Sequence, residues 1–359
     1  MKLKNLRLLN FKNHEDSRWD FNERVNCFIG DNGCGKTNVL DAIHYLSLTK
    51  SYFNSQDSVS VNFDSDFFTI KGSFEKDEIN SDIICNVSEK TSKSLKINDK
   101  NYKRFSDHIG SFPVVFISPT DTNLITENSD TRRKYIDSGI SQFNSGYLKN
   151  LISYNKTLKQ RNKLLKHFSE TDTFDEITLS TYNEMLIDLG GDIYKSRMDY
   201  LTVLIPVFQK YYNEISGGKE GVSIIYDSKI KDGNYLELLV SNQFKDRQSC
   251  RTSVGVHKDD LIFTLNNHPI KTHGSQGQQK SFLISLKLAQ FELMKEKLDL
   301  KPILLLDDIF DKLDDKRVES LVSFVKKDKF HQVFITDTNK DRSEKILKKT
   351  NSDYSIFYL

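Results

Sequence analysis

The chain has 359 residues, of which 37% are hydrophobic and 28% charged, as is typical of a globular protein of about two domains. Its 52 basic and 50 acidic residues give a net charge of +2, so overall charge does not point to nucleic acid. The four cysteines are too widely spaced for a zinc site or a disulfide-rich miniature fold, and no uncharged stretch reaches the ~18 residues of a membrane span. We therefore expect a cytoplasmic protein with reduced thiols and no membrane partner.

The first forty residues predict strand, strand, loop and helix. Residues 3–11 suggest a strand whose alternation is imperfect, and residues 24–29 (RVNCFI) form an apolar run closed by glycine, as in a buried strand. Residues 38–48 then carry apolar side chains near helical spacing. Three glycines thus join a buried strand to a helix.

The middle of the chain changes pattern twice. Residues 59–117 contain short alternating segments, including FFTIKGSF, DIICNV, SLKIN and VVFI, which predict an antiparallel sheet. Residues 130–216 are helical in pattern, with apolar positions 151, 158 and 165 spaced by seven. Because this repeat is short, we expect a compact helical lobe rather than a long coiled coil.

Strands return after residue 222, in VSIIY, YLELLV and DDLIFTL. A helix at 280–296, a strand at 303–306, a helix near 316–327 and a last strand at 332–336 follow. This alternation predicts an α/β fold with a mostly parallel sheet covered on both faces. We expect residues 1–129 and 217–359 to form the two halves of one domain, and residues 130–216 to form a lobe inserted between them.

Residues 30–37, GDNGCGKT, match the phosphate-binding loop GxxxxGK[ST] and lie between a strand and a helix, as that loop requires. The glycines let backbone N–H groups face phosphate oxygens, Lys36 adds a positive charge, and Thr37 offers a hydroxyl to Mg²⁺. The sequence therefore predicts an ATP site that includes Gly30, Asp31, Asn32, Gly33, Cys34, Gly35, Lys36, Thr37 and Asn38.

An acidic residue at the end of a neighbouring buried strand should complete this site. The segment 303–308, ILLLDD, supplies two. We expect Asp307 to hold Mg²⁺ and Asp308 to polarise the attacking water, so that Lys36 and Asp308 are the catalytic candidates. Adjacent aspartates also cap turns, but the phosphate-binding loop upstream favours the metal role.

A second potential anion site precedes the apolar helix that starts near residue 280. It consists of Ser275, Gln276, Gly277, Gln278 and Gln279, residue types that present hydroxyl and backbone N–H groups at a helix N-terminus. Such a turn is often only a helix cap. A single nucleotide in one subunit needs only one such cradle.

With this third motif the chain resembles the ABC-type ATPases and, among them, the RecF family of bacterial recombination-mediator ATPases, over essentially its whole length. Further segments that carry the resemblance are 116–119 (FISP), Arg132-Arg133, 147–148, 159–166 (KQRNKLLK), 255–261 and Leu313-Asp314 with Arg317. The resemblance implies an ABC-type head that binds ATP and Mg²⁺. In such a head Ser275–Gln279 read the γ-phosphate held by a partner subunit, and Asp314 lies in the loop at the dimer seam.

The same resemblance implies an ATP-dependent homodimer that clamps single-stranded, gapped or junction DNA. It also implies a role in recombinase loading, recombinational repair and SOS induction, with RecO and RecR as partners. Val256, Lys258, Ser129 and Asp311-Lys312 depart from the family pattern. No histidine follows Phe334-Ile335-Thr336-Asp337, where many ABC ATPases place one, so we expect a weak, DNA-stimulated ATPase that acts as a switch.

A basic segment could supply the DNA contact. Six bases and no acid lie between residues 138 and 169: Lys149, Lys156, Lys159, Arg161, Lys163 and Lys166. Basic helices are commonly just solvated faces, so both interpretations stay open.

Two alternative functions fit the sequence less well. In a transporter nucleotide-binding subunit, the phosphate-binding loop and the second anion site lie closer together in sequence, and the form SQGQQ differs. An ATPase-coupled nuclease needs a metal-dependent domain after residue 308, where we expect too little chain for one.

Overall fold

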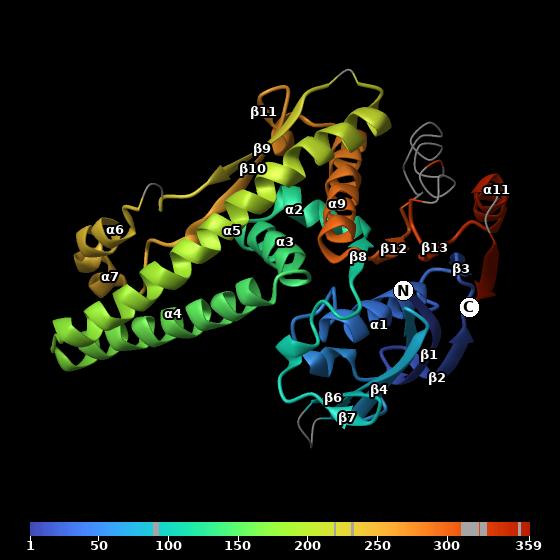
Figure 1. Ribbon diagram of the computed structural model, residues 1–359, viewed down its shortest axis with the longest axis horizontal. Helices are drawn as coiled ribbons and strands as arrows, with labels where there is room; N and C mark the ends of the chain where they lie inside the picture. The colour runs from blue at the N-terminus through green and yellow to red at the C-terminus, as the bar shows by residue number, and fades with distance from the viewer. Residues whose placement is uncertain (89–92, 219, 231–232, 310–322, 324–328, 351–352) are drawn as a thin grey trace. The chain divides into compact units, whose positions relative to one another are not determined.

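A computed structural model describes residues 1–88, 93–218, 220–230, 233–309, 323, 329–350 and 353–359 (Figure 1). The chain forms two compact units. The head comprises Met1–Thr122, Lys210–Glu220 and Ser275–Leu359, and the lobe comprises Asn123–Gln209 and Gly221–Gly274.

These units differ from the predicted segments 1–129, 130–216 and 217–359. Residues 221–274, expected in the second half of the head, group with the lobe. The physical reason is that β10 (Asp260–Leu265) packs against α3 (Ser129–Ser141), where Arg132 Nε lies 2.6 Å from Asp260 Oδ1.

The antiparallel sheet expected in the head is present and has the order β2-β1-β4-β5-β6-β7. The irregular alternation near the N-terminus arises from a register shift between Leu3 and Asn5. Strand β2 was not predicted, because HEDSRWD is almost entirely polar; it forms as an edge strand paired with β1. The strands are β1 (Lys2–Phe11), β2 (His14–Asp20), β4 (Phe67–Lys76), β5 (Ile79–Ser88), β6 (Ser94–Ile97) and β7 (Lys100–Asn101).

A second, entirely parallel sheet of the head has the order β14-β3-β13-β12-β8. Every residue of β3, β8, β12 and β13 is buried, so both faces of the sheet are covered, as predicted. The strands are β3 (Val25–Ile29), β8 (Val114–Ile117), β12 (Ile303–Asp307), β13 (Val333–Asp337) and β14 (Tyr354–Tyr358).

Two predictions for this sheet were wrong. Residues 114–117, assigned to the antiparallel sheet, pair in parallel with β12, because four consecutive apolar residues suit a strand buried on both faces. Strand β13 is not the last element, since α11 (Lys340–Thr350) and β14 follow it. The helix expected near 316–327 falls mainly on residues that are not described.

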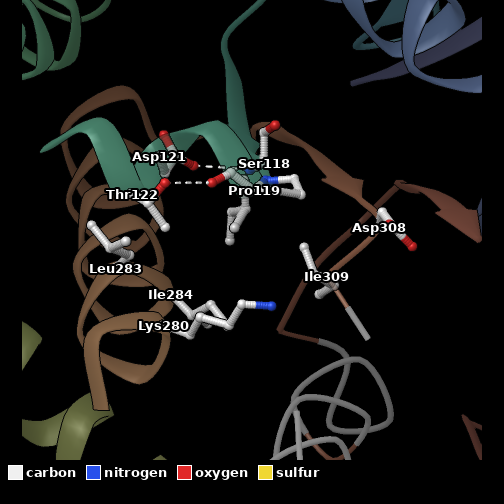
Figure 2. A pocket seen from close by; sticks show the side chains of 10 residues that line it. Ser118, Pro119, Asp121, Thr122, Lys280, Leu283, Ile284, Asp308 and Ile309 are labelled. Carbon is white, nitrogen blue, oxygen red and sulfur yellow. Dashed lines mark hydrogen bonds between the residues drawn. The ribbon is translucent and has the colours of Figure 1, made fainter. Parts of the chain in front are cut away.

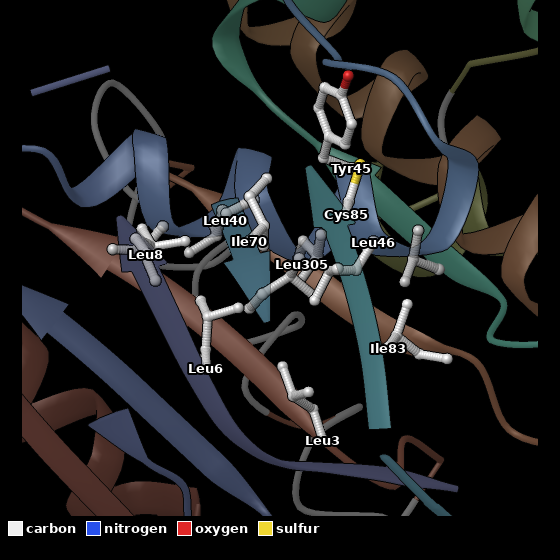
Figure 3. Close-up of a cluster of buried hydrophobic side chains, with 14 of the residues drawn as sticks. Leu3, Leu6, Leu8, Leu40, Tyr45, Leu46, Ile70, Ile83, Cys85 and Leu305 are labelled. Atoms are coloured by element: carbon white, nitrogen blue, oxygen red, sulfur yellow. The ribbon is translucent and has the colours of Figure 1, made fainter. Parts of the chain in front are cut away.

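The main helices of the head are α1 (Lys36–Leu48), α9 (Gln276–Leu298) and α11, with 3-10 turns at Asp57–Ser60, Phe105–Asp107 and Pro119–Thr122. Side chains from α1, the antiparallel sheet and the parallel sheet meet in one hydrophobic cluster. Figure 3 shows Leu6 and Leu8 of β1, Leu40 of α1 and Leu305 of β12 in this cluster. The cluster fixes α1 between the two sheets.

The lobe is built from helices and one three-stranded antiparallel sheet, order β11-β10-β9. The expected helical region is confirmed, but residues 235–240, predicted as a strand, form a helix. There Tyr235 and Leu239, one helical turn apart, are both buried. The elements are α2 (Asn123–Thr126), α3, α4 (Ser145–Thr171), α5 (Glu176–Ser216), which ends in the head, β9 (Val222–Asp227), α6 (Tyr235–Ser241), α7 (Gln243–Ser249), a 3-10 turn at Val256–Lys258, β10, β11 (His268–Pro269) and α8 (Ile270–His273).

None of the helices described here combines the length and the apolar character needed to cross a membrane.

Two buried arginines hold the interior of the lobe. Arg161 of α4 has no exposed surface and donates to Asp246 Oδ2 at 2.8 Å and to Asn183 Oδ1 at 2.8 Å. Arg197 of α5 pairs with Asp137 at 2.9 Å and with Asp259 at 3.3 Å. Arg161 therefore packs inside the lobe. Although it belongs to the basic segment of the sequence, it is not available to contact DNA at the surface.

We predict that Arg161→Ala destabilises the protein by about 3–5 kcal/mol, because it leaves the Asp246 carboxylate buried without its cation. Urea unfolding followed by circular dichroism measures this loss. The matched control is Lys166→Ala on the same helix, where the lysine side chain is 68% exposed and pairs with Glu170. A similar midpoint for both variants would contradict the structural role of Arg161.

Candidate nucleotide-binding site

The phosphate-binding loop connects β3 to α1, as predicted. Gly33 and Gly35 have φ angles of 87° and 109°, which non-glycine residues rarely adopt. The Lys36 ammonium donates to the carbonyl oxygens of Gly30 at 2.8 Å and Asp31 at 2.7 Å and lies 3.7 Å from Cys34 Sγ. The positive charge is thus held at the N-terminus of α1, where helix N–H groups favour anions.

The turn between β1 and β2 supports this loop, a role that the sequence did not predict. Asn13 Nδ2 donates to Gly33 O at 3.2 Å, and Asn38 Nδ2 donates to Asn13 Oδ1 at 2.7 Å. His14 Nε2 lies 3.2 Å from Gly35 O, and burial lowers the pKa of His14. We infer that Nε2 carries the proton of the neutral ring, because a carbonyl oxygen can only accept. The pairing of β2 with β1, which the sequence did not predict, brings Asn13 and His14 to the phosphate-binding loop.

At the carboxyl edge of the parallel sheet, the predicted acidic motif Asp307-Asp308 lies next to the phosphate-binding loop. Asp307 ends β12 and is only 4% exposed. Its carboxylate accepts from Thr37 Oγ1 at 2.7 Å, from Thr336 Oγ1 of β13 at 2.8 Å and from Ser118 Oγ, after β8, at 3.4 Å. These donors converge because parallel strands end at the same edge of a sheet. Burial raises the pKa of the Asp307 carboxyl, while the three hydroxyls and the Lys36 charge oppose that rise.

Asp308 is the first residue after β12 and has a φ of 44°, an uncommon value for a residue with a side chain. Its backbone N–H donates to Thr336 Oγ1 at 3.0 Å. The Thr336 hydroxyl thus donates to the Asp307 carboxylate and accepts from the Asp308 backbone N–H, so that one side chain contacts both aspartates. Pattern reasoning did not find Thr336, because its role depends on the neighbouring strand.

A pocket of about 350 Å³ lies next to Asp308 (Figure 2). Its walls are the segment after β8, the first turns of α9, and Asp308 with Ile309. Figure 2 shows the side chain of Lys280 extending into this space towards Ile309. The residue directly after the predicted second anion site therefore lines the same pocket as the second aspartate.

The segment predicted as a second anion site forms the N-terminus of α9. Ser275 is the N-cap: its Oγ accepts from Gln278 N at 3.3 Å, while Gln278 Oε1 accepts from Ser275 N at 2.7 Å. Gln278 Nε2 also donates to Glu220 Oε1 at 2.7 Å. Ser275 and Gln276 are exposed, and Gly277 and Gln279 are half-buried. The helix-cap interpretation is therefore correct for Ser275, and it leaves this helix end open to solvent.

A buried ion pair ties α9 to the end of β8. Lys287 Nζ lies 2.9 Å from Asp121 Oδ1 and donates to Phe116 O at 3.0 Å. Asp121 Oδ2 in turn accepts from the backbone N–H of Ser118 at 2.8 Å. Ser118 thus contacts both Asp307 and the anchor of α9. The predicted seam residue Asp314, with Leu313 and Arg317, lies outside the described residues.

The comparisons with known proteins agree on one family. The family model of the RecF/RecN/SMC N-terminal domain matches residues 2–356. The protein named DNA replication and repair protein RecF from Flavobacterium johnsoniae is 49% identical over 359 residues, covering 100% of both chains. Its counterpart from Phocaeicola vulgatus is 46% identical, over 99% of this chain and 96% of the relative.

The chain belongs to the RecF family. A solved structure of the recombination mediator protein RecF with ATP in the RecFOR pathway is 34% identical, with a TM-score of 0.87 over 94% of this chain and 92% of that one. An Smc head domain from Pyrococcus furiosus has 16% identity and a TM-score of 0.58 over 99% of this chain and 92% of that one, so it supports the fold alone. The RecF-family assignment and the ABC-type head are confirmed, and the transporter alternative is not favoured.

We predict that Gly35→Ala abolishes tight ATP binding, whereas Gly33→Ala weakens it less. Both positions have positive φ, but a Cβ at Gly35 would lie 2.6 Å from His14 Nε2 and 2.8 Å from Asn13, while a Cβ at Gly33 meets nothing within 4 Å. Titration with a fluorescent ATP analogue measures the difference. Equal losses would mean that backbone strain alone, and not the contact with the β1–β2 turn, decides the effect.

Proposed function

We propose that this RecF-family chain is an ATP-switched DNA clamp of the cytoplasm. The observation that carries this proposal is the hydrogen bond between Thr37 and Asp307, which joins two nucleotide-site motifs 270 positions apart in sequence. In P-loop ATPases a Ser or Thr of the loop and an Asp at the end of a strand serve the same nucleotide. Residues 30–38 would hold the phosphates, with Lys36 moving from its loop carbonyls to the phosphate oxygens.

The residues present fit a magnesium ion. Mg²⁺ prefers oxygen ligands and is commonly held by one or two carboxylates together with substrate phosphates. The Asp307 carboxylate and the Thr37 hydroxyl are such donors, and a buried carboxylate surrounded by neutral hydroxyls gains stability from a nearby cation. When bound, the ion would offset charge on the phosphates. Thr336 would keep the Asp307 carboxylate in place throughout.

The second anion site supports a dimer. Ser275 and Gln276 are exposed at the start of the 23-residue helix α9, so they are available to a ligand presented from outside the chain. In the proposed dimer Ser275–Gln279 contact the γ-phosphate bound to the partner subunit, and Asp314 lies at the seam. Two nucleotides then link two heads, and their hydrolysis separates them.

Hydrolysis would be slow. Asp308 is the candidate that polarises the attacking water, because it follows Asp307 and lines the adjacent pocket. No histidine follows β13 in the sequence, and the last residue of this strand, Asp337, is buried and paired with Arg342. The head therefore serves as a switch whose state depends on bound nucleotide, with DNA stimulating turnover.

The family assignment supplies the cellular role in this proposal. Relatives of this chain carry the name DNA replication and repair protein, and one solved relative is described as a recombination mediator in the RecFOR pathway. We propose that this chain likewise binds single-stranded, gapped or junction DNA and works with RecO and RecR. Its dimer would assist recombinase loading in recombinational repair and SOS induction.

The first test separates ATP binding from dimerisation. Ser275→Arg should bind ATP with unchanged affinity but stay monomeric, because the long side chain blocks the helix end that meets the partner's nucleotide. Sedimentation with and without ATP and Mg²⁺ gives the mass. Ser275→Ala is the control for loss of the cap, which costs about 1 kcal/mol of stability but adds no bulk. Lys36→Ala should lose both ATP binding and the dimer. A Ser275→Arg dimer of normal strength contradicts the composite site.

The second test concerns Asp308. Asp308→Asn should bind ATP but hydrolyse it about 10²- to 10⁴-fold more slowly, which prolongs the lifetime of the dimer on DNA. Phosphate release and dissociation from immobilised gapped DNA provide the two readouts. Asp341→Asn, an exposed position on α11, is the control for the change of charge. Normal turnover in Asp308→Asn would remove this residue as the catalytic candidate.

A further inference from the structure

The solvent side of α4 carries a row of lysines. Lys149, Lys156 and Lys163 are all exposed and are seven residues apart. Because seven residues make nearly two helical turns, successive members are offset by only about 20° and lie about 10.5 Å apart along the axis. Lys159 and Lys166, also exposed, flank this row. We call these five residues the lysine face.

The packing of α4 accounts for this face. Tyr147, Tyr154, Arg161 and Phe168 repeat with the same spacing of seven and are buried. Tyr147, Tyr154 and Arg161 precede Lys149, Lys156 and Lys163 by two positions each, and two residues correspond to about 200° around a helix, so the two rows lie on opposite sides of it. The interior of the lobe therefore fixes the side of α4 on which the lysines are exposed.

The lysine face is little neutralised by its surroundings. Lys166 pairs with Glu170 at 3.4 Å, whereas within the described part of the chain Lys149, Lys156, Lys159 and Lys163 form no ion pair. On α5, Asp192 accepts from Asn150 of α4 at 3.0 Å. Glu184 and Asp188 of α5 are exposed on their own helix.

We propose that the lysine face of α4 binds the phosphate backbone of DNA. This inference rests on the proposed function, and it names the surface involved. From Lys149 to Lys166 the face spans about 25 Å, over which a duplex carries roughly fifteen phosphate charges. Lysines are flexible point charges, which suits contacts that are independent of base sequence.

The composition of the face favours nucleic acid over an acidic protein. Protein interfaces usually contain an apolar or aromatic centre. On this side of α4 the side chains among the lysines include Ser153, Gln160 and His167, and Ile152 is the exposed large hydrophobic residue of the helix, at 49%. A row of evenly spaced cations with a single exposed hydrophobic residue, Ile152, among them matches a polyanion better than an apolar protein surface.

The test removes three charges from this face and three elsewhere. The variant Lys149→Ala/Lys156→Ala/Lys163→Ala is compared with Lys100→Ala/Lys195→Ala/Lys345→Ala, whose lysines are exposed on other elements. Binding of the full chain, with ATP and Mg²⁺, to a fluorescein-labelled gapped duplex is followed by anisotropy between about 50 and 200 mM salt. We expect the first variant to lose about tenfold or more in affinity, while the control stays within about twofold of the parent. The slope of log affinity against log salt concentration should decrease in the first variant by the equivalent of roughly two to three phosphate contacts.

Each other outcome has a distinct meaning. Unchanged affinity and salt dependence in the first variant overturn the inference and leave the proposed function standing. Equal losses in both variants also overturn it, because binding then follows total charge. A parent protein that binds no DNA in any nucleotide state contradicts the proposed function as well. Melting temperature and ATP-dependent mass verify that the variants are folded, and Lys156→Glu provides a single-site version of the same test.

Discussion

The rest of the head depends on the hydrogen bonds that the buried Asp307 carboxylate accepts. Three hydroxyls reach it, from the phosphate-binding loop, from β13 and from the segment after β8. A buried carboxylate is costly unless such donors or a cation surround it. Each donor stands at the carboxyl edge of the same parallel sheet, so correct pairing of β3, β13, β12 and β8 is required before the site can exist. The site therefore depends on the complete sheet.

The same edge connects the candidate nucleotide site to α9. Ser118 contacts Asp307 through its hydroxyl and Asp121 through its backbone N–H, and Asp121 holds Lys287 in the middle of α9. Because the Lys287–Asp121 pair is buried, separating its partners would be costly, and the helix is held firmly at this point. The end that begins at Ser275 is exposed by comparison. A rigid anchor and an open N-terminus suit a helix that presents its first turn to a ligand.

The lobe combines a polar interior with a charged exterior. Arg161 and Arg197 are buried with their carboxylate partners, and Tyr154 and Tyr235 meet near Gly255, where a Cβ would lie only 2.2 Å from the Tyr235 hydroxyl. Buried ion pairs contribute less to stability than to orienting the elements they join. In α4 this orientation has a direct effect on the surface, since the buried row that includes Arg161, the partner of Asp246, determines the side of the helix on which the lysines are exposed.

The sequence alone determined the motifs and most of the elements. The glycine pattern around Lys36, the run ILLLDD and the turn before α9 are local signals, and a strand, a loop and a helix follow from residues that are neighbours in the chain. The tertiary structure decided what depends on distant partners. It showed that β2 forms on the edge of β1, that residues 114–117 join the parallel sheet, and that residues 235–240 fold as a helix. It also showed that Arg161 is buried while the lysines beside it in sequence are exposed. The sequence could not predict this, because the carboxylate that pairs with Arg161 in the interior lies 85 positions away.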